Sequence, residues 1–177
     1  MPTIFSHPAV PILLGVALGT RIIPMRLIVA GVAASILPDL DVISFKFGVD
    51  YADQFGHRGA SHSLVFAVIT GVIALLAAKR LHASKLAAFS FIFIATISHG
   101  LLDMLTTGGL GVALAWPIWS ERLFFPLQVI RVSPLSLSTF FGTRGITVLT
   151  SELIWIWLPL SLMALTALLV RRSRSRP

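Results

Sequence analysis

The sequence predicts an all-α protein, a polytopic membrane bundle of about five apolar helices with a long cap loop on one side. Three observations favour this class. Hydrophobic residues make up 56% of the 177-residue chain, and the mean hydropathy is +0.91. Charged residues make up 12%, well below the roughly 25% usual in soluble domains. The basic residues lie mostly between apolar runs, as topology signals do.

Five apolar segments are expected to form the helices, and they cover residues 8–19, 27–37, 64–78, 86–102 and 153–170. The last two approach the roughly 20 residues that cross about 30 Å of hydrocarbon. The first two are short and would extend, tilt or pack as partial spans. Residues 104–152 are rich in Pro, Gly and Trp, which indicates an irregular interfacial cap. We therefore expect a single integral membrane domain over residues 1–177.

The distribution of charge predicts the orientation of the bundle. If all five segments cross, one side has nine basic residues and no acidic one: Arg21, Arg26, Lys79, Arg80, Lys85, Arg171, Arg172, Arg174 and Arg176. All seven acidic residues lie on the opposite side. The positive-inside rule then places the C-terminus in the cytoplasm and the N-terminus outside it. The first charged side chain follows the first apolar run, so that run is not expected to be a signal peptide.

Composition also limits the function. The net charge of +7 would suit a nucleic-acid-binding protein, but no basic stripe interleaved with aromatic residues is present, and we do not expect nucleic acid as a partner. The chain has no cysteine, so a zinc site would have to use histidine and carboxylate ligands. There is no phosphate-binding glycine loop, HExxH motif or Ser-His-Asp order.

Imidazoles and carboxylates gather on the predicted non-cytoplasmic side. They are His7, Asp39, Asp41, His57, His62, His99 and Asp103, and only His82 falls on the other side. His99 and Asp103 are four residues apart, so a helix would place them on one face. Histidine and aspartate are ligands that zinc accepts. The pattern predicts a shared metal site at one membrane surface.

Each group also has a simpler interpretation. Asp39 and Asp41 could mark the membrane boundary, although two carboxylates this close could also bridge metal ions. His99 and Asp103 could form a buried hydrogen bond between helices, but ionisable groups near the end of a membrane helix are by default functional candidates.

The remaining histidines require particular local structure. His57 and His62 could lie in a hydrated loop, and convergence would require a turn at Gly59 and a helix start near Ser61, which could cap that helix. His7 lies at a plausible helix start, where a lone histidine is more often incidental.

The other charged residues on this side are expected to support the site. Arg58, Arg122, Arg131 and Arg144 could contact a substrate anion, and Glu152 could act as a ligand or proton acceptor. Apart from Arg58, each is at least as well explained as an anchor at the membrane interface.

The chain resembles the YdjM family of bacterial inner-membrane proteins, commonly described as membrane-bound metal-dependent hydrolases. The matching segments are 6–7, 37–41, 57–63, 98–103, 107–111, 116–117, 121–126 and 151–153, which extend over almost the whole chain. The resemblance implies the same seven histidines and aspartates as metal-site residues. More distantly, the histidine-rich helical plan is similar to zinc-dependent phospholipase C and P1-type nucleases.

We therefore expect a membrane-bound metal-dependent hydrolase of the bacterial inner membrane, with one or two divalent ions, zinc foremost, at the periplasmic surface. Seven candidate ligands exceed the roughly three that hold one catalytic zinc, which favours two ions with Asp39 or Asp41 as bridge or base. The lipid bilayer is the expected partner, and a lipid or lipid-linked phosphoester is the expected substrate. The alternative is a non-catalytic metal transporter or a structural factor with His-Asp pairs.

Overall fold

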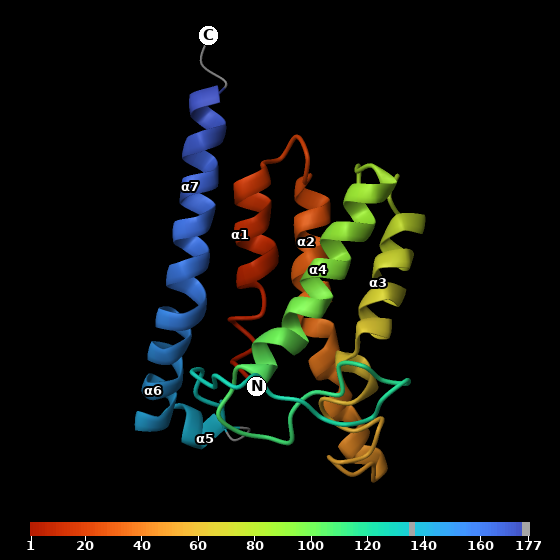
Figure 1. Cartoon of the computed structure of the whole chain (residues 1–177), viewed down its shortest axis with the longest axis vertical. Helices are drawn as coiled ribbons and strands as arrows, with labels where there is room; N and C mark the ends of the chain where they lie inside the picture. Colours follow the sequence, from red (N-terminus) through yellow and green to blue (C-terminus); the bar gives the residue numbers. More distant parts are fainter. Residues whose placement is uncertain (135–136, 175–177) are drawn as a thin grey trace.

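The computed structural model describes residues 1–134 and 137–174, and in this part of the chain five apolar helices lie side by side with no strand. The expected all-α bundle is confirmed. Figure 1 shows the helices running alternately up and down, with the two termini at opposite ends. The five helices are α1 (Ala9–Leu18), α2 (Met25–Ile36), α3 (Leu64–Leu76), α4 (Lys85–Met104) and α7 (Leu158–Arg174).

Two of these helices are longer than the sequence predicts. After α2 the chain continues through the 3₁₀ helix η1 (Leu37–Phe47), so the apolar element covers Met25–Phe47. Pro38 does not end it, because proline is tolerated in the first turn of a new helical segment, where no intrahelical donor is lost. Similarly, α6 (Thr143–Glu152) and the π-helical turn η3 (Leu153–Trp157) lead directly into α7.

Three described elements are long and apolar enough to cross a membrane: Met25–Phe47, Lys85–Met104 and Thr143–Arg174. The other two, α1 and α3, are shorter apolar helices. This agrees with the expectation that the first segment is short, whereas the second segment is longer than expected.

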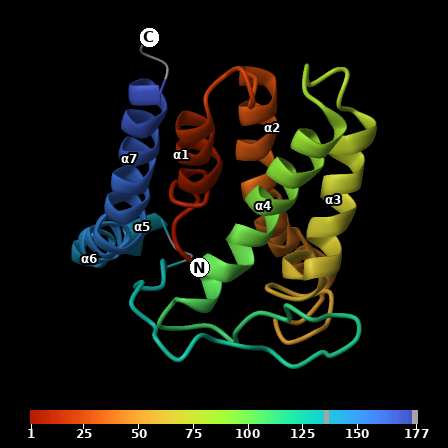
Figure 2. The same cartoon turned by 45° about the horizontal axis from the view of Figure 1, so that its top comes forward.

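Helix α4 is the centre of the packing, because it contacts both α2 and α3. Helix α1 lies between α2 and α7, and Figure 2 shows α7 on the outer side of α1. Phe91 and Ile92 of α4 are buried against Leu27 and Ala34 of α2 and Ala74 of α3. By contrast, most side chains of α7 are exposed, and those before Arg171 are mainly apolar, as expected for a helix that faces lipid.

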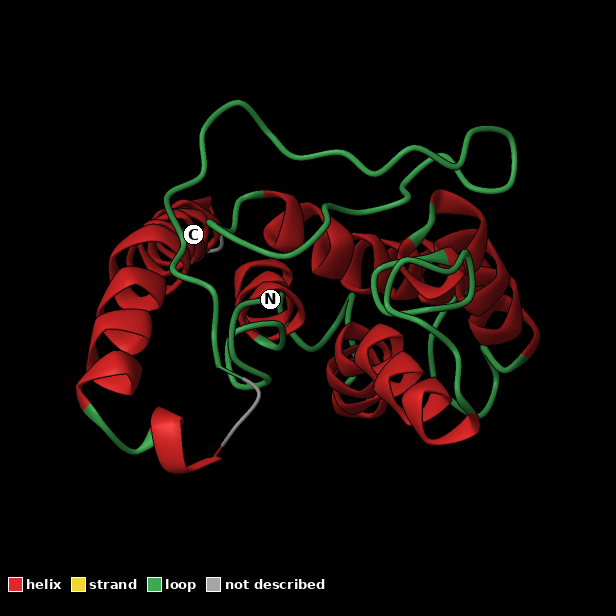
Figure 3. Ribbon diagram, turned by 90° about the horizontal axis from the view of Figure 1, so that it is seen from below, coloured by secondary structure: helices red, strands yellow, loops and turns green. Residues whose placement is uncertain are grey.

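One end of the bundle carries most of the irregular structure, and we call it the capped end. It contains the N-terminus, η1, the short 3₁₀ turn η2 (Ala60–His62), the loop after α4, and α5 (Leu137–Phe140) (Figures 1 and 3). An isolated bridge pairs Thr106, just after α4, with Ile130, and a second bridge pairs Val112 with Leu123 within the loop. The irregular cap is shorter than expected, because α6 already begins at Thr143.

Candidate metal centre

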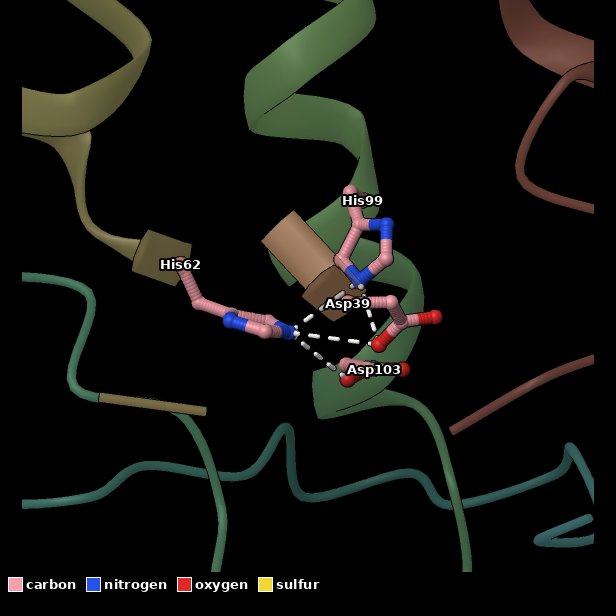
Figure 4. A group of neighbouring side chains, drawn as sticks. All are labelled: Asp39, His62, His99 and Asp103. Carbon is pink, nitrogen blue, oxygen red and sulfur yellow. Dashed lines mark hydrogen bonds and ion pairs between the residues drawn. The ribbon is translucent and has the colours of Figure 1, made fainter. Parts of the chain in front are cut away.

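Four of the predicted ligands converge at the capped end. Asp39, His62, His99 and Asp103 are all buried, and one ligand atom from each lies within 4.8 Å of the others. Figure 4 shows the two imidazoles and the two carboxylates pointing toward one another. Residues from three separate segments of the chain therefore meet at one point.

Local structure explains how each of the four side chains reaches the centre. His99 and Asp103 occupy one face of the last turns of α4, as their four-residue spacing predicts. Asp39 lies in the first turn of η1, and His62 ends η2. The helix start after His62 differs from the expectation, because α3 is capped by Ser63, whose Oγ accepts a hydrogen bond from Phe66 N at 3.1 Å.

The closest contact in the centre joins two imidazole nitrogens. His62 Nε2 and His99 Nε2 are 3.1 Å apart. His99 Nε2 is also 3.3 Å from Asp39 Oδ1, and His62 Nε2 is 3.5 Å from Asp103 Oδ2. Two nitrogens and two carboxylate oxygens thus surround a small volume that only a cation or a proton can stabilise.

The Nδ1 atoms of these two rings already have partners outside the centre. His99 Nδ1 donates to the carbonyl oxygen of Ser35 at 2.7 Å. His62 Nδ1 lies 3.0 Å from Ser61 Oγ and 3.2 Å from Asp41 Oδ2. With a proton on each Nδ1, the neutral rings direct both Nε2 lone pairs into the centre. This is the arrangement that outer hydrogen bonds impose on metal-binding histidines.

The charges around His62 strongly favour a cation. Burial alone would lower the pKa of His62, but the nearby carboxylates of Asp103 and Asp41 raise it to about 9. Without a metal ion, the ring therefore retains a second proton at neutral pH. The carboxylates that retain this proton would also attract a divalent ion in its place.

His7 approaches the same two carboxylates from the other side. Its Nε2 is 3.9 Å from Asp39 Oδ2 and 4.0 Å from Asp103 Oδ1, and its ring stacks on His99 with the ring centroids 3.7 Å apart. Burial, with a smaller effect from His99, lowers the pKa of His7 to about 3, so the ring is neutral at pH 7. A neutral imidazole with a free lone pair is competent to bind metal.

Six buried polar atoms of the centre lack a hydrogen bond anywhere in the described part of the chain. They are both ring nitrogens of His7 and both carboxylate oxygens of Asp39 and of Asp103. More than 90% of buried polar groups in proteins are hydrogen-bonded, so six atoms without a hydrogen bond in one place require an explanation. The residue types and their convergence fit a bound divalent cation.

Asp41 and His57 lie beside the centre. Asp41 Oδ1 is 2.7 Å from His57 Nδ1, and Asp41 Oδ2 accepts hydrogen bonds from Ser61 Oγ at 2.7 Å and from Arg58 N at 3.1 Å. Asp41, His57 and His62 form a second set whose ligand atoms lie within 4.8 Å of one another. Because its oxygens are already engaged, Asp41 orients both histidines.

Arg58 is fully buried and contacts the protein with all three guanidinium nitrogens. Nε is 2.9 Å from Asp103 Oδ2, one terminal nitrogen donates to Gly108 O at 2.9 Å, and the other donates to Thr106 Oγ1 at 3.1 Å. The Asp103 contact is a close ion pair that lacks hydrogen-bond geometry. Arg58 therefore positions Asp103 in this structure instead of facing a substrate anion.

The two remaining predicted site residues hold neighbouring backbone. Arg122 donates to the carbonyl oxygens of His57 at 2.7 Å and Asp53 at 2.8 Å, and so orders the loop before His62. Glu152 is buried in α6, and its carboxylate accepts hydrogen bonds from the backbone and hydroxyl of Thr3 and from the hydroxyl of Ser6. Glu152 thereby fixes the segment that carries His7.

Sequence reasoning missed three groups of the site. The Ser35 carbonyl orients His99, Ser61 bonds Asp41 instead of capping a helix, and Thr106 holds Arg58. A backbone carbonyl leaves no signal in the sequence. The hydroxyls of Ser61 and Thr106 are each next to a predicted motif, and this proximity is the only signal that could have found them.

Comparison of the sequence with known proteins identifies its family. The model of the YdjM inner membrane proteins matches residues 1–176. The chain belongs to the YdjM family. Inner membrane protein YbcI of Escherichia coli (strain K12) is 47% identical over 160 residues, which cover 90% of this chain and 92% of that protein. No solved structure matches the chain. The YdjM match includes all seven predicted ligands, and the family name supports an inner-membrane protein.

Proposed function

We propose that this YdjM-family chain is a membrane-bound hydrolase that depends on divalent metal ions, zinc being the ion we expect. The observation that carries the proposal is the set of six buried atoms on His7, Asp39 and Asp103 that form no hydrogen bond within the described residues, next to the two facing Nε2 atoms of His62 and His99. Such a donor set of imidazoles and carboxylates suits zinc and related divalent ions.

The carboxylates support two ion positions. Asp39 presents Oδ1 to His99 and Oδ2 to His7, and Asp103 presents Oδ2 to His62 and Oδ1 to His7. Donor atoms on both sides of the two carboxylates would therefore be available to more than one ion. These two aspartates and three histidines would hold the ions, and Asp41 and Arg58 would orient the side chains of His62 and Asp103.

A bound divalent ion would supply Lewis-acid polarisation of a scissile ester and activation of a water molecule. The residues of the chain would provide the dry surroundings that strengthen this effect, since His7, His99 and Asp103 are fully buried. Asp39 is the most exposed of these ligands, at 6%, and is the residue we propose as proton acceptor.

We propose the periplasmic surface as the place of reaction and a lipid or lipid-linked phosphoester as the substrate. The capped end holds the metal-site residues, whereas the basic turns after α1 and after α3 lie at the opposite end (Figure 1). The positive-inside rule favours a cytoplasmic position for those turns. A phosphoester at headgroup depth would then be nearest to the centre.

The burial of the centre favours a second candidate, a structural metal site without catalysis. Structural zinc sites are closed by four protein ligands, whereas catalytic sites keep one position open. Asp39, His62, His99 and Asp103 provide four ligands, and none is more than 6% exposed. A metal transporter is less well supported, because the ligands gather at one end of the bundle.

Metal content and turnover measured together discriminate between these candidates. The purified protein should contain two divalent ions per chain by elemental mass spectrometry and should hydrolyse phosphodiesters or phospholipids. His99→Ala should lose both metal and turnover, His7→Ala should keep one ion, and His82→Ala serves as the matched control that keeps two. Bound metal without turnover on any ester would select the structural candidate, and absence of metal would reject both.

A further inference from the structure

A second polar cavity lies at the capped end, outside the metal centre. Its volume is about 340 Å³, and it is lined by Thr107, Arg131, Thr143, Arg144, Thr147 and Val148. None of the histidines or aspartates of the metal centre lines it. Five of the six lining residues carry a cation or a hydroxyl, so the cavity suits a polar ligand.

The backbone around the cavity is held on two sides. The segment that carries Arg131 is bound to the end of α4, because Ile130 N donates to Leu105 O at 3.1 Å and Thr107 N donates to Ile130 O at 2.9 Å. Arg131 N also donates to Ser151 Oγ of α6 at 2.9 Å. Ile130 is fully buried, so the wall that presents Arg131 is anchored.

The charge of the cavity is uncompensated. The side chains of Arg131 and Arg144 form no hydrogen bond or ion pair with residues 1–134 or 137–174, and none of the lining residues is acidic. Arg144 lies in the first turn of α6, whose N-cap residue Gly142 has no side chain to accept from the free backbone amides. Two guanidinium groups and a helix N-terminus therefore direct positive potential into one space.

We propose that this cavity binds a phosphate group. Arginine provides planar pairs of donors that match phosphate oxygens, and the hydroxyls of Thr107 and Thr143 can donate to the same oxygens, whereas that of Thr147 donates to Thr143 O at 3.1 Å. Ile146 and Leu149 of α6 are exposed apolar residues at the start of a membrane-length element, so a bilayer crossed by this element would have its lipid headgroups near the cavity. The phosphate could belong to an anionic lipid headgroup or to a soluble phosphate, and this proposal does not depend on metal chemistry.

The test uses the full chain in nanodiscs of phosphatidylcholine alone or mixed with phosphatidylglycerol. Native mass spectrometry would count retained phosphatidylglycerol, and calorimetry would measure binding of inorganic phosphate. The double variant Arg131→Gln/Arg144→Gln should bind phosphate at least about tenfold more weakly, because each basic residue near an anionic lipid surface contributes appreciably to the binding free energy. Lys46→Gln is the matched control, because it removes an exposed cation from the same end of the bundle.

Each outcome decides the proposal. Selective retention of phosphatidylglycerol, lost in the double variant and kept in Lys46→Gln, supports a lipid ligand. Binding of inorganic phosphate without lipid preference, with the same dependence on the arginines, supports a soluble ligand. Equal binding by the double variant and the unmodified chain, or an equal loss in Lys46→Gln, would overturn the proposal. The melting temperature should not change, because both guanidinium groups are exposed.

Discussion

Asp41 contacts several groups at the edge of the candidate metal centre. Its carboxylate contacts His57 and accepts from Ser61 and the backbone of Arg58, so it fixes the orientation of the loop that presents His62. Partners of this kind set the tautomer and the basicity of metal-binding histidines. The effect of Asp41 on metal affinity should therefore exceed its effect on stability.

Asp41→Asn should lower zinc affinity by about 10- to 100-fold, the usual effect of removing an outer partner of a metal ligand. Competition against a coloured chelator measures this change. Asp50→Asn is the matched control, because Asp50 is an exposed carboxylate in the same stretch of chain. Unchanged affinity in Asp41→Asn would show that Asp41 does not orient His62.

Gly109 adopts a backbone conformation, and lies at a position, that a larger residue would not fit. Its φ is +93°, and an added Cβ would lie 2.7 Å from a guanidinium nitrogen of Arg58. Gly109→Ala should therefore lower the free energy of unfolding by about 2–3 kcal/mol, from backbone strain and displacement of Arg58.

Gly48→Ala separates these two contributions. Gly48 also has a positive φ, +77°, but an added Cβ would have no neighbour within 4 Å. Only the backbone strain applies, so the loss should be about 1 kcal/mol. Unfolding in detergent compares the two variants, and equal losses would refute a steric role for Arg58.

At the scale of elements, the ends of helices determine where the ligands lie. His62 is held by the turn that leads into α3, and Ser63 caps that helix by accepting from Phe66 N. Ser84 caps α4 in the same way by accepting from Ala87 N at 3.2 Å, but at the opposite end of the bundle. The two serines therefore form a natural pair for comparison.

Ser63→Ala and Ser84→Ala should each lower the free energy of unfolding by about 1 kcal/mol, the typical effect of losing an N-cap. Only Ser63→Ala should also weaken metal binding, because His62 precedes Ser63 directly. Thermal unfolding and metal titration on both variants check this difference. Weakened metal binding in Ser84→Ala would mean that the effect is global.

At the scale of the whole molecule, alternation of the helices brings distant residues to one end. Reporter domains fused after Gly48 and after Arg80 should report opposite compartments, with the Gly48 fusion periplasmic, because α3 lies between the two positions. Enzymatic activity of compartment-specific reporters measures this. Activity of both fusions in one compartment would contradict a crossing by α3.

The sequence predicted the helical bundle well, because apolar runs and their separating charges determine membrane helices directly. The His99–Asp103 pair was also predictable from helix periodicity. The continuation of α2 beyond Pro38 was not, since a 3₁₀ segment has no distinctive hydrophobic pattern. Nor could spacing reveal that Arg58 faces Asp103, because this contact depends on the positive φ of Arg58, 64°, and on the fold of a distant loop.

The spread of the five candidate ligands along the chain has a mechanical consequence. His7 precedes α1, Asp39 follows α2, His62 precedes α3, and His99 and Asp103 lie on α4. Two metal ions held by all five residues would cross-link segments that are separated by dozens of residues. In this chain, which has no cysteine, the ions would take the part that disulfides play in other proteins. Removal of the metal ions by a chelator should consequently release the helices at the capped end together, in a single cooperative step.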